Sequence, residues 1–212
     1  MGLIRTLALV AGVIAGAESA PAAPDGGLFG SQERKRVVDG SHPFRAWARV
    51  IDRHFADLKE GKVCPKADIP ECRVIAWLET LKPMRGKRLI EKLNYVNAAL
   101  NETPYLTDLR NWGQQDYWET PLEFLTHYGD CEDYSIAKYM ALRALDVPID
   151  TMRIAVVNDE NLGIGHAVLV VYTQNKRLVL DNQTDQVVET DRVRHYTPIY
   201  SLNERAWWLH RK

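Results

Sequence analysis

The sequence carries almost no net charge, since 27 Lys and Arg residues stand against 28 Asp and Glu residues. It also lacks a long basic stripe interleaved with aromatic residues, and this absence argues against nucleic acid as a partner. HExxH, GxSxG, P-loop and strand-following GxGxxG motifs are missing as well, which argues against a zincin, a nucleophile-elbow hydrolase and a nucleotide-binding enzyme. The chain has 212 residues, 46% of them hydrophobic, which is enough for one domain with a sizeable core.

Long apolar runs are absent too, and the one at the N-terminus is too short to span a bilayer. Residues 1–23 combine an early positive charge, this apolar run and a series of small residues, an order typical of a secretory signal peptide. We expect cleavage after Ala20 or Ala23 and export to a bacterial periplasm; an uncleaved membrane anchor is the alternative. Residues 24–40, rich in Pro, Gly and charge, are expected to form a mobile leader to a domain over 41–212.

Cysteine is scarce, with three in the whole chain. In an oxidising compartment, Cys64 and Cys72 can close a short loop as a disulfide. Two free or metal-linked thiols are the alternative. Cys131 is then left unpaired, and an unpaired thiol in an exported protein needs a reason, of which catalysis is one.

Hydrophobic spacing predicts helices first and strands later, which is the order of an α+β fold. The predicted helices cover 44–60, 72–82, 85–101 and 121–127, and a further one runs from near Cys131 to the Val147–Pro148 pair. The predicted strands cover 153–158, 165–173 and 177–182. Residues 193–210 are expected to close the chain as another strand and a short helix. The helix that begins near Cys131 carries one apolar stripe, so we expect it to be buried along one side.

Three residues along the chain have the chemistry of a nucleophile, a base and an orienting acid. Cys131 lies at a predicted helix start, where free N–H groups and the helix dipole favour a thiolate. His166 begins a strand and Asp181 ends the next one, which is where a base and its orienting carboxylate are needed. Asp185 is a second candidate for the orienting acid. Each residue also has an ordinary structural explanation, and the prediction depends on their combination.

The hairpin formed by the predicted strands 165–173 and 177–182 tests whether His166 and Asp181 can meet. With residues 173–176 as a four-residue loop, Tyr172 faces Arg177 across the hairpin. His166 and Asp181 then share one face of the sheet as diagonal neighbours, about 7–8 Å apart at the backbone and within side-chain reach. A three-residue loop would reverse the parity and separate them.

Three segments resemble the bacterial transglutaminase-like cysteine proteinase family: GDCEDYSIAKYMALRAL at 129–145, GHAVLVVYT at 165–173 and LVLDNQ at 178–183. The resemblance covers most of residues 40–205. It implies a papain/transglutaminase-like α+β fold, in which an N-terminal helical lobe contributes a nucleophile helix that packs on an antiparallel sheet. It also implies that Cys131 is the nucleophile, His166 the base and Asp181 the orienting residue.

The same resemblance implies a biological setting. Members of the family are calcium-dependent periplasmic endopeptidases that cleave a large surface adhesin near its N-terminus and so release biofilm. An inner-membrane receptor that senses cyclic di-GMP restrains them. The adhesin and this receptor are therefore the expected partners, and Ca²⁺ is the expected cofactor.

The carboxylates that flank Cys131 need an explanation, because negative charge disfavours a thiolate. Asp130, Glu132 and Asp133 offer the hard oxygen ligands that calcium prefers. We expect them to bind Ca²⁺, which would neutralise the acidic charge beside the thiol and make the helix start rigid. The alternative is that acidic residues simply suit a helix N-terminus.

An acyl-transfer reaction also needs donors for the oxyanion. The backbone N–H of Cys131 is one candidate. The indole N–H of Trp118 is the first-ranked side-chain candidate, by analogy with transglutaminases, and the amides of Gln114 and Gln115 are others.

Two further functions stay open from the sequence. A transglutaminase or amidase would use the same Cys-His-Asp site with an amine or a side-chain amide in place of water or the peptide. A non-enzymatic exported calcium-binding partner protein would keep the fold without the reaction.

Overall fold

The computed structural model describes residues 26–61 and 73–212. The expected signal peptide over 1–23 and the expected Cys64–Cys72 disulfide lie outside these residues. Within the described ranges, none of the helices combines the length and hydrophobicity that a bilayer-spanning segment needs.

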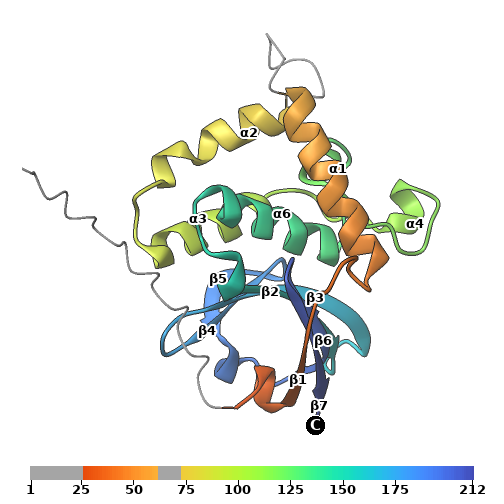
Figure 1. The fold of residues 1–212 in the computed structure, drawn as a ribbon, viewed down its shortest axis with the longest axis vertical. Coiled ribbons are helices and arrows are strands. Elements are labelled where there is room, and N and C mark those ends of the chain that lie inside the picture. The colour runs from red at the N-terminus through yellow and green to blue at the C-terminus, as the bar shows by residue number, and fades with distance from the viewer. Residues whose placement is uncertain (1–25, 62–72) are drawn as a thin grey trace, which may run out of the picture.

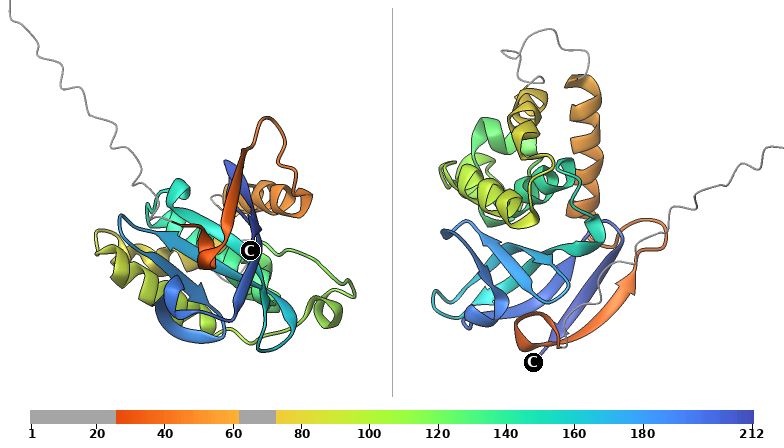
Figure 2. Two further views of the ribbon diagram at one scale, coloured as in Figure 1. Left: turned by 90° about the horizontal axis from the view of Figure 1, so that it is seen from below. Right: turned by 90° about the vertical axis from the view of Figure 1, so that its left-hand side faces the viewer.

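The helices gather on one face of a single sheet, as Figure 1 and the right-hand view of Figure 2 show. They are α1 (Arg45–Gly61), α2 (Arg73–Leu81), α3 (Leu89–Asn101), α4 (Asp108–Asn111), α5 (Pro121–His127) and α6 (Cys131–Ala144). The predicted helices before residue 150 are confirmed, with one shift, and α4 was not predicted. Residues Lys82–Met84 form a short 3₁₀ turn, so α3 starts at Leu89 and not at 85.

The sheet contains the strands β1 (Gln32–Val37), β2 (Met152–Asp159), β3 (Ile164–Tyr172), β4 (Arg177–Asp181), β5 (Thr184–Glu189), β6 (Tyr196–Leu202) and β7 (Ala206–Arg211). Their order is β1-β7-β6-β2-β3-β4-β5, and the paired strands are antiparallel. The α+β class is therefore confirmed.

Two expectations about the chain ends are wrong. The mobile leader over 24–40 contains β1, which pairs with β7 along its whole length. The composition of residues 24–40 gives little sign of this strand, because β1 is polar and is held by its pairing with β7. An ion pair of 2.9 Å between Glu33 and the buried Arg153 also holds it. Residues 206–211 form β7 and not a helix, since their side chains alternate between more and less buried positions as a strand requires.

Helix α6 is the centre of the core. Its residues from Asp133 to Leu142 are all buried, so the prediction of burial along one side understates its position. The helix packs on β3 and β2 with one side, and α3, α5 and α2 cover the other. A helix enclosed in this way has little freedom to move, and its first residue, Cys131, is held in place relative to the sheet.

Candidate active site

Cys131 is the first residue of α6, and a tight connection from α5 places it there. Tyr128 ends α5 with a φ of 71°, and Gly129 follows. A Cβ atom on Gly129 would lie 2.6 Å from Asp133 Oδ2, so only glycine fits between α5 and α6. Leu106 N donates to the Gly129 carbonyl at 2.9 Å, which ties this connection to the chain after α3.

His166 and Asp181 form a buried hydrogen bond of 2.9 Å between Nε2 and Oδ1. The hairpin pairs Tyr172 with Arg177, so the predicted four-residue loop and the shared face are confirmed. The backbone N–H of Gln183 donates to Asp181 Oδ1 at 3.0 Å. Burial would raise the pKa of Asp181, but the hydrogen bonds and the charge of His166 outweigh burial and lower this pKa overall.

Tyr196 on β6 is a further member of this group that the sequence did not indicate. Its hydroxyl donates to Asp181 Oδ2 at 2.6 Å, and its ring lies 5.6 Å from the His166 ring, centroid to centroid. Both oxygens of Asp181 are therefore fixed, one by His166 and one by Tyr196. Tyr196 lies within a strand pattern like any other, and no local signal could have identified it.

The Cys131 thiol lies near the backbone of Ala167 on β3. The backbone N–H of Ala167, the residue after His166, acts on the thiol and lowers its pKa, while burial, the charge of Glu132 and the Glu132 hydrogen bond raise it by more. The thiol donates to Glu132 Oε2 at 3.1 Å. The thiol therefore lies near the strand that carries His166, and its acidic surroundings favour the protonated form over the thiolate.

A group of carboxylates surrounds the start of α6. Asp130 and Glu132 approach each other beside Cys131, and Glu132 also forms a group with Asp108 and Asp116. Burial and the neighbouring Glu132 raise the pKa of Asp130 to about 8. Oδ1 of Asp130 and Oδ1 of Asp108 are buried without a hydrogen-bond partner among the described residues. Unpartnered acidic oxygens of this kind suit a hard cation such as Ca²⁺.

The contacts of Asp133 differ from those of Asp130 and Glu132, and its binding of calcium stays a prediction. Its Oδ1 accepts from the Glu119 backbone N–H at 2.8 Å, and its Oδ2 accepts from the Asp130 backbone N–H at 3.0 Å. The side chain is completely buried and forms a group with Asp108 and Glu119 instead. Asp133 therefore fixes the start of α6 against the preceding loop, and it does so with both of its oxygens.

The structure gives Trp118 a different partner from the one expected. Its indole N–H donates to Asp116 Oδ1 at 2.9 Å, so it is not directed at an open oxyanion position. Arg53 on α1 donates to the Trp118 carbonyl. Trp118 thus positions Asp116, while the backbone N–H of Cys131 stays as the oxyanion candidate at the helix start.

Asp108 and Asp116 are the acidic residues that sequence reasoning missed. Both lie in the irregular segment between α3 and α5, more than ten positions before Cys131. The available signal was the number of oxygen-bearing side chains in a segment with no hydrophobic periodicity. This signal indicates a ligand-rich loop but does not identify which residues meet the nucleophile helix.

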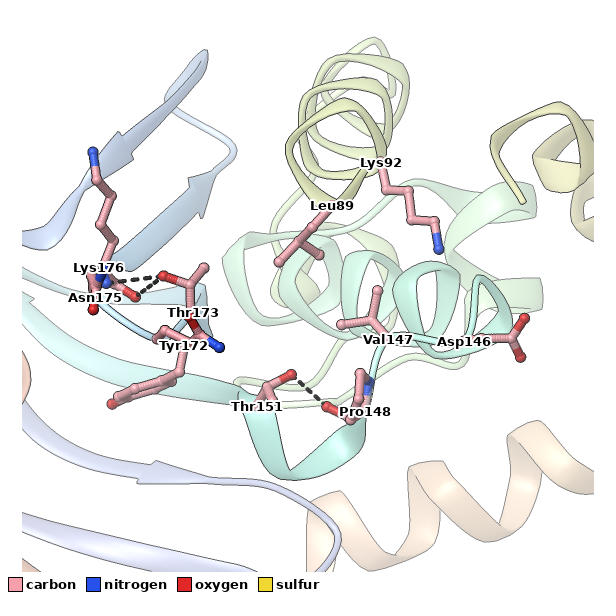
Figure 3. A pocket seen from close by; sticks show the side chains of 11 residues that line it. Leu89, Lys92, Asp146, Val147, Pro148, Thr151, Tyr172, Thr173, Asn175 and Lys176 are labelled. Carbon is pink, nitrogen blue, oxygen red and sulfur yellow. Dashed lines mark hydrogen bonds between the residues drawn. The ribbon is translucent and has the colours of Figure 1, made fainter. Parts of the chain in front are cut away.

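Of two cavities in the described structure, one borders the acidic group and the other lies away from the predicted catalytic residues. One of about 410 Å³ is lined by Arg49 and Arg53 of α1 and by Gln114, Asp116 and Trp118 among others. It borders the acidic group through Asp116. The other, of about 650 Å³ and shown in Figure 3, lies between α3, the α6–β2 connection and the β3–β4 turn. None of the three predicted catalytic residues lines it.

Comparison with known proteins finds a matching family model and similar solved structures. A family model described as bacterial transglutaminase-like cysteine proteinase matches residues 62–210. The structure of Legionella pneumophila LapG is similar, with a TM-score of 0.61 and 30% identity over 74% of this chain and 87% of that chain. Calcium-bound LapG gives a TM-score of 0.62 with the same identity and coverage. EGTA-treated LapG gives 0.61 at 30% identity, over 74% of this chain and 84% of that chain. No curated protein matches the chain.

Proposed function

Because the chain belongs to the bacterial transglutaminase-like cysteine proteinase family, we propose that it is a calcium-dependent cysteine endopeptidase that uses Cys131, His166 and Asp181. The observation that carries the proposal is the 2.9 Å hydrogen bond between His166 and Asp181, formed where the start of α6 brings Cys131 to β3. Nucleophile, base and orienting acid come from a helix and two strands, and this is the arrangement that activates a thiol.

The reaction follows from these positions. Asp181 holds Nε2 of His166, so Nδ1 is left to take the proton from the Cys131 thiol. The thiolate attacks a peptide carbonyl, and the oxyanion accepts a hydrogen bond from the backbone N–H of Cys131. His166 then gives its proton to the leaving amine, which leaves an acyl-enzyme. Water, with His166 as general base, hydrolyses the thioester and restores the thiol.

The acidic group is the proposed calcium site. Asp108, Asp116, Asp130 and Glu132 would hold the ion, and the unpartnered oxygens of Asp108 and Asp130 support this assignment. Bound calcium would supply positive charge beside the thiol. Glu132 would then no longer accept the hydrogen bond of Cys131, and the thiol would be free to give its proton to His166.

The proposed substrate is a large surface adhesin, cleaved near its N-terminus in the periplasm so that biofilm is released. An inner-membrane cyclic di-GMP receptor is the proposed restraint. These proposals are supported by the family resemblance and by the signal-like composition of residues 1–23. The cavity lined by Arg49, Gln114 and Asp116, which borders the proposed calcium site, is the proposed position of the bound peptide.

The test is incubation with fragments from the N-terminal regions of candidate adhesins, with calcium or with a chelator, for the wild type and Cys131→Ala. We expect peptide fragments from the wild type in calcium and none in the other three conditions. Mass spectrometry separates the alternatives. A cross-link or a deamidated side chain would indicate a transglutaminase or amidase. Binding by Cys131→Ala together with an unchanged substrate in every condition would indicate a non-enzymatic partner protein.

A further inference from the structure

The segment before β1 contains a tight turn, η1 (Leu28–Gly30), on the face of the sheet opposite the helices (Figures 1 and 2). Phe29, in the middle of this turn, has the backbone angles φ 49° and ψ 36°. These angles lie in the left-handed region, which costs energy for a residue that carries a Cβ atom. Strained residues of this kind persist only where the surrounding structure holds them, and they cluster at functional sites.

The neighbours of Phe29 hold the turn in place. Leu28 is completely buried, and its backbone N–H donates to Glu33 Oε1 of β1 at 2.7 Å. On the other side, the guanidinium group of Arg177 on β4 donates to the Gly26 carbonyl at 2.8 Å. These contacts attach the turn to both β1 and β4, so the position of the Phe29 side chain is fixed relative to the sheet.

The ring of Phe29 packs against Tyr196, whose hydroxyl holds the acid of the proposed triad. The two ring centroids are 5.7 Å apart and the ring planes are nearly perpendicular, at 89°, which is a favourable edge-to-face geometry. The Tyr196 hydroxyl donates to Asp181 Oδ2 at 2.6 Å, and a hydrogen bond of 2.9 Å joins Asp181 Oδ1 to His166 Nε2. A continuous series of contacts thus runs from the N-terminal turn to the proposed general base.

The hydroxyl of Tyr196 can serve Asp181 only while its ring keeps one orientation. Burial and the hydrogen bond to Asp181 raise the pKa of Tyr196, so its hydroxyl stays protonated and acts as a donor. The rings of His166 and His195 lie 5.6 and 4.4 Å from the Tyr196 ring, centroid to centroid. One of these belongs to the proposed triad, and the other is the preceding residue of the chain. Phe29 adds a third ring from a distant segment.

We propose that Phe29 is a positioning residue for the reaction: its ring fixes the tilt of the Tyr196 ring and so keeps the Tyr196 hydroxyl directed at Asp181. This proposal rests on the proposed protease function. The turn precedes residues 62–210, which the family model matches, so this role would not follow from the family.

The test compares Phe29→Leu with the wild type in calcium-containing buffer. Leucine keeps an apolar side chain at this position but removes the ring. We expect kcat to fall about 2- to 5-fold, the effect of losing one edge-to-face contact, and by no more than in Tyr196→Phe. KM should change by less than about twofold, because Phe29 acts on a group that forms after binding. Phe29→Tyr, which restores the ring, should restore kcat.

A double-mutant cycle distinguishes positioning from a general effect on the fold. In Tyr196→Phe the hydroxyl is already absent, so the addition of Phe29→Leu should not lower kcat any further. An equal fall in kcat on the wild-type and Tyr196→Phe backgrounds would overturn the proposal, because Phe29 would then act without the hydroxyl. A wild-type kcat for Phe29→Leu alone would overturn it as well.

Val188 supplies a matched control for the structural alternative. Phe29 and Val188 are both partly buried and pack on the hydrophobic cluster that contains Leu28 and Tyr196. Val188→Ala therefore removes apolar cover from the same cluster, and it should lower the melting temperature without changing kcat. A fall in kcat of the same size in Val188→Ala and Phe29→Leu would show that cover of the cluster is the cause, and would overturn the proposal.

A measurement without substrate separates this proposal from the protease proposal. The imidazole proton in the hydrogen bond between His166 and Asp181 is followed by NMR. We expect Phe29→Leu and Tyr196→Phe to shift its resonance in the same direction, and Val188→Ala to leave it unchanged. If the wild type cleaves no peptide, the protease proposal fails, but this resonance still reports on Phe29.

The same resonance decides the remaining outcomes. A wild-type resonance in folded Phe29→Leu would overturn the positioning role even if the wild type is an active protease. Phe29→Met is the second variant if leucine is not tolerated, and the same outcomes apply to it. Failure of both variants to fold would assign Phe29 a structural role and would also overturn the proposal.

Discussion

The thiol of Cys131 donates a hydrogen bond to the carboxylate of Glu132 across 3.1 Å. The partner of the nucleophile is thus an acid and not the base that would activate it. Burial and this acidic neighbour together raise the pKa of the Cys131 thiol. Under the proposed mechanism, a change at Glu132 would therefore favour the thiolate that attacks the substrate.

Replacing Glu132 with glutamine should make the thiol more reactive without calcium. The substitution removes a negative charge that raises the thiol pKa, so the thiolate fraction at pH 7 increases. We expect alkylation by iodoacetamide in chelator to become about tenfold faster, the effect of about one pKa unit, and the response to added calcium to be lost. Glu189→Gln, on the distant β5 edge, is the control. A wild-type alkylation rate for Glu132→Gln in chelator would contradict this account.

Asp181 and Tyr196 should differ in their effects on catalysis. Asp181→Asn removes the charge that stabilises the protonated His166, and kcat should fall at least about 100-fold. Tyr196→Phe removes one hydrogen bond to Asp181 and should lower kcat by about 2- to 10-fold. In both variants KM should stay close to the wild-type value. Steady-state kinetics on one peptide substrate distinguishes these results, and a Tyr196→Phe loss as large as that of Asp181→Asn would refute the ranking.

Gly129 should be intolerant of a side chain. A Cβ atom there would lie 2.6 Å from Asp133 Oδ2 and 2.9 Å from a Phe124 ring carbon, so Gly129→Ala should lower the free energy of unfolding by about 1–3 kcal/mol. Gly165→Ala is the matched control, because nothing lies within 4 Å of its added Cβ. Urea unfolding in chelator measures both. Equal stability of the two variants would show that the α5–α6 connection can shift to accommodate a Cβ atom at position 129.

Glu119 should make the fold less stable as the pH rises from 4.5 to about 7. Burial raises its pKa from 4.5 to about 7. The folded protein therefore holds a proton that the unfolded chain releases between these values, and stability falls as the pH rises through this window. Glu119→Gln should increase the free energy of unfolding by about 1–3 kcal/mol at pH 8 and have little effect at pH 4.5. Urea unfolding at both pH values, in chelator, is the measurement. A gain of the same size at both would exclude titration of Glu119 as the cause.

Local features of the sequence determined much of the fold. Hydrophobic spacing placed the helices of the N-terminal half, and β-branched runs placed β2, β3 and β4. The hairpin between β3 and β4 was predictable in register as well, because a four-residue loop fixes the parity of the two strands. That parity was sufficient to place His166 beside Asp181. The edge strand β1 was missed because it has little hydrophobic signal and depends on β7 for its hydrogen bonds.

What the tertiary structure alone decided is which distant residues meet at the start and along the inner face of α6. Asp108 and Asp116 reach Glu132 from the segment between α3 and α5, and Tyr196 reaches Asp181 from β6. The sequence by itself determined the helix that Cys131 begins and the hairpin that places His166 beside Asp181, since the spacing and pairing of these elements are local. Contacts between segments far apart in the chain depend on how layers pack, and no residue pattern within one segment records that packing.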